Sequence, residues 1–143
     1  MNFVVHPLKG VNDIEFGMTS AQVRAKVNVA PEPDLHRATS KEFPSDFFPD
    51  LGFFCDYDDE GHLETIEFVL AGRPVLGGVN ILSLPFHLAA EVLSRLDPQV
   101  VRAPDMVTSR RLSLSVWSSD PEDEGIPVEA FLIGRPGYFD DVD

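Results

Sequence analysis

Several features that would indicate a compartment or a chemistry are scarce in this sequence. One cysteine, Cys55, stands in 143 residues, so the chain cannot form an internal disulfide bond. An apolar run of about 18 residues, which a membrane-spanning helix requires, is missing. Residues 1–8 carry neither a positively charged leader nor a long apolar core. We therefore expect no signal peptide, no membrane span and a cytoplasmic location.

Basic residues are also scarce. The chain has 11 Lys and Arg against 24 Asp and Glu, a formal net charge of −13. Binding to nucleic-acid phosphate or to anionic lipid relies on clustered Lys and Arg, so we expect neither a nucleic acid nor a membrane as partner. So acidic a surface suits a basic protein partner or divalent cations. The alternative is that the charge serves solubility alone.

Motifs for catalysis and for metal binding are missing as well. The four histidines, His6, His36, His62 and His87, include no pair with the spacing of metal ligands on a helix, and there is no second cysteine for a zinc site. Neither a G-x-S-x-G motif nor a phosphate-binding glycine loop is present. Cys55 has no histidine near it in the sequence, so we expect a buried, inert thiol. The prediction is a protein without enzymatic activity, cofactor or metal.

One stretch, "CDYDDEGHLETIEF" at residues 55–68, nevertheless fits the calcium loop of an EF-hand. Positions one, three, five, six and twelve of that pattern are taken by Asp56, Asp58, Glu60, Gly61 and Glu67. The flanking residues alternate between apolar and polar with a period of two, which predicts two strands and a turn where an EF-hand needs helices. In a hairpin Glu67 lies too far along its strand to close a cage around a cation. We therefore prefer a hairpin with an acidic tip, and keep calcium as the alternative.

The sequence also contains an internal repetition. Residues 10–27 and 78–96 both begin Gly-Val-Asn and run into a helical pattern, and "EFVLAGRP" at 67–74 is echoed by "EAFLIGRP" at 129–136. Because the matches keep the same order, about 65 residues apart, we predict one domain built from a tandem repeat. The domain and its two copies span residues 1–143, about 10–74 and about 78–136.

Each copy is predicted to form a helix followed by an antiparallel hairpin. In the first copy Thr19 and Gln22 have capping-box spacing for a helix to about Val29. In the second copy Pro85 opens a helix that stops at Asp97. Its apolar stripe, which we expect to face the core, consists of Leu88, Val92, Leu93 and Leu96.

The hairpins follow from apolar residues that alternate on both sides of an acidic turn. In the first copy these are Phe53, Cys55, Tyr57, Ile66, Phe68 and Leu70; in the second they are Leu112, Leu114, Val116, Val128, Ala130 and Leu132. Two such copies predict an α+β fold: one antiparallel sheet with helices packed on one face.

Residues 31–50 are predicted as a long loop, because they contain four prolines. Three phenylalanines, Phe43, Phe47 and Phe48, are expected to pin this loop to the core. The alternative is that Phe47 and Phe48 form an exposed anchor for a partner.

The first copy opens with a motif made by Gly10, Phe16, Gly17, Met18, Thr19 and Val23. It resembles the repeat of the β-lactamase-inhibitor-protein fold and of the outer-membrane lipoprotein domain of the SmpA/OmlA type, and it is similar to cytoplasmic immunity proteins that neutralise bacterial toxins. The doubled helix-plus-hairpin pattern extends the resemblance to most of the chain. The resemblance implies a scaffold without catalytic activity that blocks another protein.

Acidic hairpin tips are the candidate partner-binding site, each preceded by an aromatic residue that could anchor a partner. The candidate residues are Tyr57, Asp58, Asp59, Glu60, Trp117, Asp120, Glu122, Asp123 and Glu124. The hypothesis is an immunity-type protein that occludes the active site of a cognate toxin. The alternatives are an adaptor or structural protein without a toxin partner, and an enzyme of unknown chemistry; for Tyr57 and Trp117, a place in the core remains open.

Overall fold

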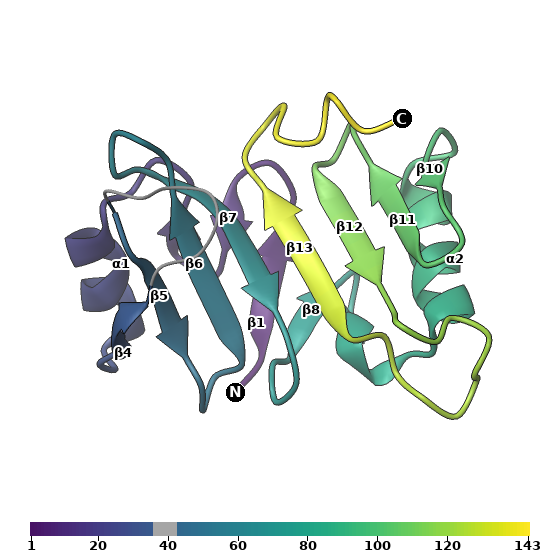
Figure 1. Cartoon of the computed structure of the whole chain (residues 1–143), viewed down its shortest axis with the longest axis horizontal. Coiled ribbons are helices and arrows are strands. Elements are labelled where there is room, and N and C mark those ends of the chain that lie inside the picture. The colour runs from purple at the N-terminus through teal and green to yellow at the C-terminus, as the bar shows by residue number, and fades with distance from the viewer. Residues whose placement is uncertain (36–42) are drawn as a thin grey trace.

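The computed structural model describes residues 1–35 and 43–143, without the side chains of residues 33–35 (Figure 1). Within these residues the fold is α+β, as predicted, with two α-helices and two β-sheets. The prediction of a single sheet is wrong. The second sheet is made of strands of two to four residues, too short for a periodic pattern in the sequence.

The larger sheet is antiparallel throughout and has the strand order β10-β11-β12-β13-β7-β6-β5-β4. At its centre β13 pairs with β7, which places Phe131 opposite Phe68 and Ile133 opposite Ile66. The strands in chain order are β4 (Glu32–Leu35), β5 (Ser45–Phe48), β6 (Phe53–Tyr57), β7 (Leu63–Phe68), β10 (Val101–Arg102), β11 (Met106–Ser109), β12 (Leu114–Trp117) and β13 (Ala130–Gly134). Both predicted hairpins, β6–β7 and β12–β13, are therefore confirmed.

The smaller sheet has the order β3-β2-β1-β8-β9 and includes one parallel pair, β1 with β8. Its strands are β1 (Phe3–His6), β2 (Gly10–Val11), β3 (Ile14–Glu15), β8 (Pro74–Leu76) and β9 (Val79–Asn80). The two Gly-Val-Asn motifs of the sequence thus lie in the β2 and β9 regions of this sheet.

The helices begin where their capping residues predict. Helix α1 (Ser20–Val27) starts with a complete capping box, in which the Thr19 hydroxyl accepts from the Gln22 N–H and the Gln22 amide oxygen accepts from the Thr19 N–H. It ends at Asn28 in the left-handed conformation. Helix α2 (Phe86–Leu96) follows a short 3-10 helix, η1 (Ile81–Ser83), with Pro85 at its N-cap.

The expected core stripe of α2 is only partly correct. Leu93 is fully buried, but Leu88 is 39% and Leu96 40% exposed. The helix buries another face, formed by Phe86, Ala89, Ala90 and Leu93, and contacts β11 and β12. Leu88 and Leu96 therefore belong to a second apolar stripe, whose middle residue, Val92, is partly buried against the core.

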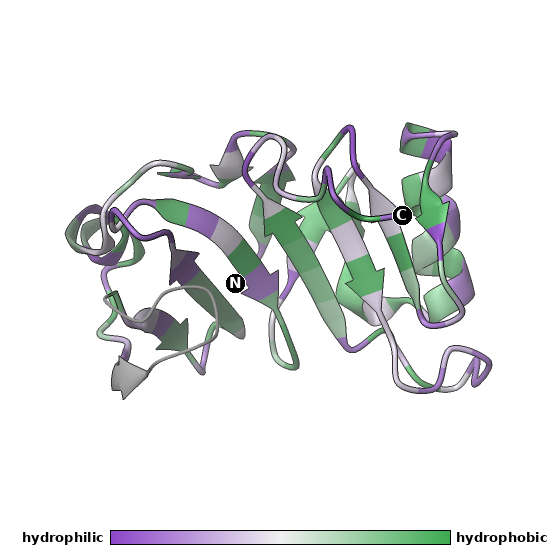
Figure 2. Ribbon diagram, turned by 45° about the horizontal axis from the view of Figure 1, so that its top comes forward, coloured by the Kyte–Doolittle hydropathy of each residue, from purple (hydrophilic) through white to green (hydrophobic). Residues whose placement is uncertain are grey.

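Phenylalanines dominate the core between the sheets. The rings of Phe3 and Phe53 pack edge to face at 5.0 Å, and Phe68 lies 5.2 Å from Phe53. Cys55 has no exposed surface, so the buried thiol is confirmed, and burial raises its pKa. Figure 2 shows hydrophobic residues along the central strands and more hydrophilic ones in the connecting turns.

The predicted loop at residues 31–50 contains two strands, β4 and β5, so it is a loop only in part; residues 36–42 lie outside the described residues. Phe48 is buried in the core and cannot be a partner anchor, while Phe47 stacks on Phe54 at 4.1 Å. Phe43 is 37% exposed. The prolines did not prevent strands here, because Pro44 and Pro49 flank β5 and Pro33 lies within β4, an edge strand, where a proline is tolerated.

Candidate functional site

The two acidic turns lie at opposite ends of the larger sheet. Thr65, which follows the first turn, pairs with Gly134 at the end of β13, whereas Phe68 at the end of β7 pairs with Phe131 at its start. The turns are therefore separated by the length of a strand, about 17 Å for five residues (Figure 1). The structure does not bring the predicted acidic residues together into one site.

The first tip, residues 58–62, is largely built by Asp58. Its carboxylate accepts hydrogen bonds from the N–H groups of Glu60 at 2.9 Å and His62 at 3.0 Å. Both bonds lower the pKa of Asp58, and the bond from the His62 N–H has the larger effect. Asp59 and Glu60 are exposed, and the Glu60 carboxylate lies 3.8 Å from the His62 ring. Asp58 thus stabilises the turn.

The calcium pattern is not arranged as a cage. Asp56 is 5% exposed and accepts hydrogen bonds from Ser45 at 2.5 Å and Thr65 at 3.2 Å on neighbouring strands. Glu67 lies on β7, opposite Phe54. Across residues 1–35 and 43–143, no group of three or more His, Cys, Asp or Glu side chains is placed to hold a metal ion.

Tyr57 is not a surface anchor. It is 1% exposed, and its hydroxyl donates to the Asp46 carboxylate at 2.7 Å. Burial raises the pKa of this phenol strongly. The alternation that places Phe53 and Cys55 inside the core also turns Tyr57 inward, so the alternative of a core residue is the correct one.

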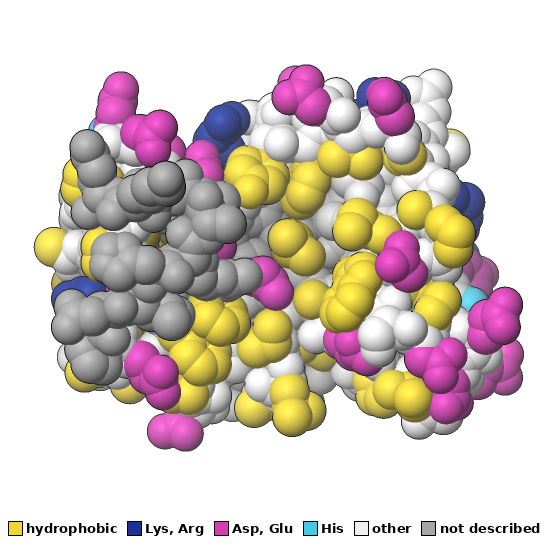
Figure 3. Space-filling model, in the orientation of Figure 1, with side chains coloured by type: hydrophobic (Ala, Val, Ile, Leu, Met, Phe, Trp, Pro, Cys, Tyr) yellow, Lys and Arg dark blue, Asp and Glu magenta, His cyan; other side chains and the backbone are white. Residues whose placement is uncertain are grey.

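The second tip is a long loop, residues 118–129, that contains no Lys or Arg. Four of its carboxylates are exposed, those of Asp120, Glu122, Asp123 and Glu124, while Glu129 at its end is partly buried. Trp117 precedes the loop and is half-buried, with its indole N–H donating to Asp105 at 3.3 Å. Figure 3 shows a gathering of acidic side chains at the lower right, where Figure 1 places this loop. Five of the nine predicted residues therefore lie in one region.

An apolar pocket adjoins this loop. It has a volume of about 300 Å³ and is lined by Leu70, Ala71, Gly72, Leu82, Ile126, Pro127, Val128 and Glu129. Leu70, at 92% exposed, and Ile126, at 38%, leave large apolar surfaces open to solvent. A pocket lined by these side chains is suited to bind an apolar group.

Backbone contacts hold the two walls of the pocket. The pairing of Phe68 with Phe131 brings the β7–β8 turn beside the start of β13. Val128 donates to the Leu84 carbonyl at 2.8 Å, and Val69 donates to the Gly52 carbonyl at 2.9 Å. The pocket is therefore formed by segments that are anchored to the β5–β6 turn and to Leu84, the residue that follows η1.

Sequence reasoning missed the apolar half of this site. Leu70 was predicted to continue the strand, but β7 ends at Phe68 and Leu70 lies in the turn. The overlooked signal was Ile126 followed by Pro127 within an otherwise acidic and polar run. Leu70 and Ile126 line the same pocket only because β7 pairs with β13, a contact between residues far apart in the sequence.

The combination can recognise a protein with an apolar side chain flanked by basic groups. Apolar pockets anchor the side chains that dominate binding energy, and surrounding charges raise the association rate and the specificity.

Comparisons with protein-family models, with curated proteins and with solved structures find no match to this chain. In the described part of the chain, no helix has the length and apolar character needed to cross a membrane.

Proposed function

We propose that this chain is an immunity-type protein that binds a cognate bacterial toxin and occludes its active site, without catalysis, cofactor or metal, in the cytoplasm. The observation that carries the proposal is the apolar pocket beside four exposed carboxylates. A toxin that acts on nucleic acid needs a basic cleft to hold phosphate, and an acidic loop competes for that cleft. Leu70 and Ile126 supply an apolar contact that charge alone lacks.

We further propose that the fold is a tandem repeat of the β-lactamase-inhibitor-protein or SmpA/OmlA type, with its helices on one face. The element order supports this: in each half a short strand pair precedes a helix, and four strands of the larger sheet follow it. In the sheet, β7 and β13 lie at the centre and β4 and β10 at the two edges. One feature departs from the repeat, because "EFVLAGRP" leaves the sheet after Phe68 while "EAFLIGRP" continues through Gly134.

The test is capture of a partner from native lysate, followed by measurement of its association rate. We expect one basic partner whose association slows at high salt, because screening removes long-range attraction. Neutralising the loop with D120N, E122Q, D123N and E124Q together is expected to slow association about tenfold or more at low salt.

The opposite tip offers a control that removes half as many charges. D59N with E60Q also removes exposed carboxylates, at the far end of the sheet, and is expected to change the rate by about twofold at most. An equal effect for each charge removed in both variants would show that only the net charge acts. An unchanged rate in the loop variant would refute the assignment of the site.

The second candidate is an adaptor or structural protein, for which the same pocket and loop would bind cell machinery. Leu70→Asp separates binding at this pocket from binding elsewhere, because Leu70 is 92% exposed and its replacement leaves the core intact. If the captured partner has no toxic activity that this chain suppresses, the adaptor is favoured over the immunity function.

A further inference from the structure

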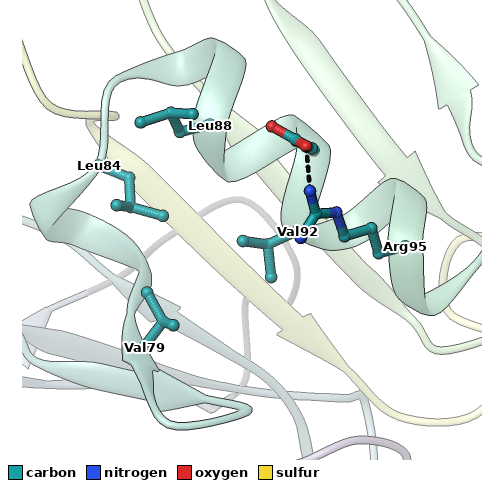
Figure 4. Close-up of a pocket in the computed structure, with 6 residues that line it drawn as sticks. Val79, Leu84, Leu88, Val92 and Arg95 are labelled. Carbon is teal, nitrogen blue, oxygen red and sulfur yellow. Dashed lines mark hydrogen bonds and ion pairs between the residues drawn. The ribbon is translucent and has the colours of Figure 1, made fainter.

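A second apolar surface lies on the exposed side of α2. Two adjoining cavities, of about 310 and 220 Å³, share Val79, Val92 and Arg95 in their linings. Together they form one groove between α2 and the β8–β9 hairpin. In Figure 4 the side chains of Val79, Leu84, Leu88 and Val92 surround the larger of the two cavities.

The groove is built from a stripe of α2 that the core covers only in part, at Val92. Leu88, Val92 and Leu96 follow one another at intervals of four residues, so they lie along one side of the helix. Leu88 and Leu96 are 39% and 40% exposed. The opposite wall ends at Gly77 and Gly78, where an added Cβ would meet no atom within 4 Å. A second helix can therefore approach the stripe closely.

The charge on this groove differs from that of the rest of the molecule. Among the described residues, the lining includes two charged side chains, Glu91 and Arg95, and these form an ion pair at 2.5 Å. The rim is therefore neutral in a chain whose net charge is −13. A basic partner would gain no attraction here, while two copies of this acidic chain would repel each other least through such a patch.

We infer that this groove is the contact between two copies of the chain, with α2 packed antiparallel on α2 about a two-fold axis near Val92. A two-fold contact requires a self-complementary surface. In this arrangement Leu88 of one protomer lies opposite Leu96 of its partner. Glu91 and Arg95, which flank the same side of the stripe, meet their opposite charges on the partner at both ends.

The first experiment is sedimentation equilibrium of the full chain over a wide range of concentrations and at two salt concentrations. We expect a reversible dimer that is stronger at high salt, because screening reduces repulsion between two acidic copies. This salt dependence is opposite to that of the proposed toxin binding, so the two proposals fail independently. A chain that stays monomeric at every concentration and salt would overturn the inference and leave the groove to another protein.

Leu88→Glu tests the surface itself and is expected to raise the dimer Kd about tenfold or more. Ala25→Glu, on the exposed surface of α1, changes the net charge equally and is expected to leave the Kd within about twofold. Circular dichroism checks that both variants fold. Equal dimerisation of Leu88→Glu and wild type would overturn the assignment of the groove.

Crosslinking tests the axis. Val92→Cys places two thiols near each other across the two-fold and is expected to give a disulfide-linked dimer under mild oxidation. Ala25→Cys should remain monomeric, and the native Cys55 is buried and gives no background. If both cysteine variants crosslink equally, the antiparallel contact near Val92 is refuted.

Discussion

Asp46 attaches helix α1 to the larger sheet. This carboxylate has no exposed surface and accepts hydrogen bonds from Tyr57 at 2.7 Å, Ser20 at 2.7 Å and Arg24 at 2.6 and 3.1 Å. Its hydrogen bond raises the pKa of Arg24 further. Because α1 has only one buried residue, Val23, this polar cluster replaces much of the apolar contact that usually fixes a helix.

Replacement of Asp46 by Ala is expected to lower the free energy of unfolding by about 3 kcal/mol, since it leaves the Tyr57 hydroxyl buried without its acceptor and removes the ionic partner of Arg24. Urea unfolding measures the change. Tyr57→Phe, which removes one donor, should cost about 1 kcal/mol. A loss below about 1 kcal/mol for Asp46→Ala would show that α1 is held by other contacts.

The ionisation of Asp97 is expected to make the stability of the fold depend on pH. Burial alone would raise its pKa, but hydrogen bonds from the Ser109 hydroxyl at 2.7 Å and the Gln99 N–H at 3.0 Å, together with the charges of two nearby arginines, Arg111 and Arg110, lower it. The folded state therefore releases this proton more readily than the unfolded chain does. The resulting stabilisation is complete above the unfolded pKa of about 3.9 and is lost as the pH falls through the lower folded value.

We therefore expect the stability difference between wild type and Asp97→Asn to shrink as the pH is lowered from 7 to 3. Glu64 is the matched control of opposite sign, because burial raises its pKa despite Arg135 at 3.7 Å. The stability of Glu64→Gln relative to wild type should improve as the pH rises through the folded pKa of Glu64. A difference that is constant with pH in the Asp97→Asn series would contradict the assignment.

At the scale of elements, the turns at one end of the sheet support each other. Gly52 has φ +73°, and a Cβ there would lie 2.1 Å from the backbone nitrogen of Gly72. Gly72 belongs to the β7–β8 turn, which forms one wall of the candidate pocket. The β5–β6 turn therefore positions that wall by close backbone contact.

Gly52→Ala is expected to destabilise the protein by about 2 kcal/mol more than Gly77→Ala, measured by urea unfolding. Both glycines have positive φ, but a Cβ at Gly77 meets nothing within 4 Å. The comparison separates steric overlap from backbone strain. Equal losses would show that the contact between the turns relaxes freely.

The elements that sequence could predict are those with local causes. Thr19 with Gln22 places the start of α1, and apolar alternation places β6 and β7. The β1–β8 pair and the pocket between Leu70 and Ile126 depend on contacts between residues about 50 to 70 positions apart, which a local pattern does not encode. Charge predicted which residues of the β12–β13 loop are exposed, but not that the two acidic tips lie at opposite ends.

At the scale of the whole molecule, 24 acidic residues against 11 basic ones repel one another in the folded state. We expect the urea midpoint of unfolding to rise between about 20 and 500 mM NaCl. This interval runs from roughly one-tenth to several times the physiological ionic strength, and surface charges become screened within it. A matched sucrose series at constant salt controls for general solvent effects. A midpoint that falls with salt would mean that the ion pairs matter more than the repulsion.

The central pairing of β7 with β13 also sets an order of events during translation. When the ribosome has released residues 1–100, β7 has β6 on one side, while its other side still presents unpaired N–H and C=O groups. The partner, β13, emerges more than 60 residues after β7, and the parallel partner of β1 is similarly delayed. At ordinary synthesis rates the nascent chain therefore exposes the unpaired edge of β7 for several seconds. Binding of chaperones to the nascent chain should fall sharply once residue 134 has left the exit tunnel.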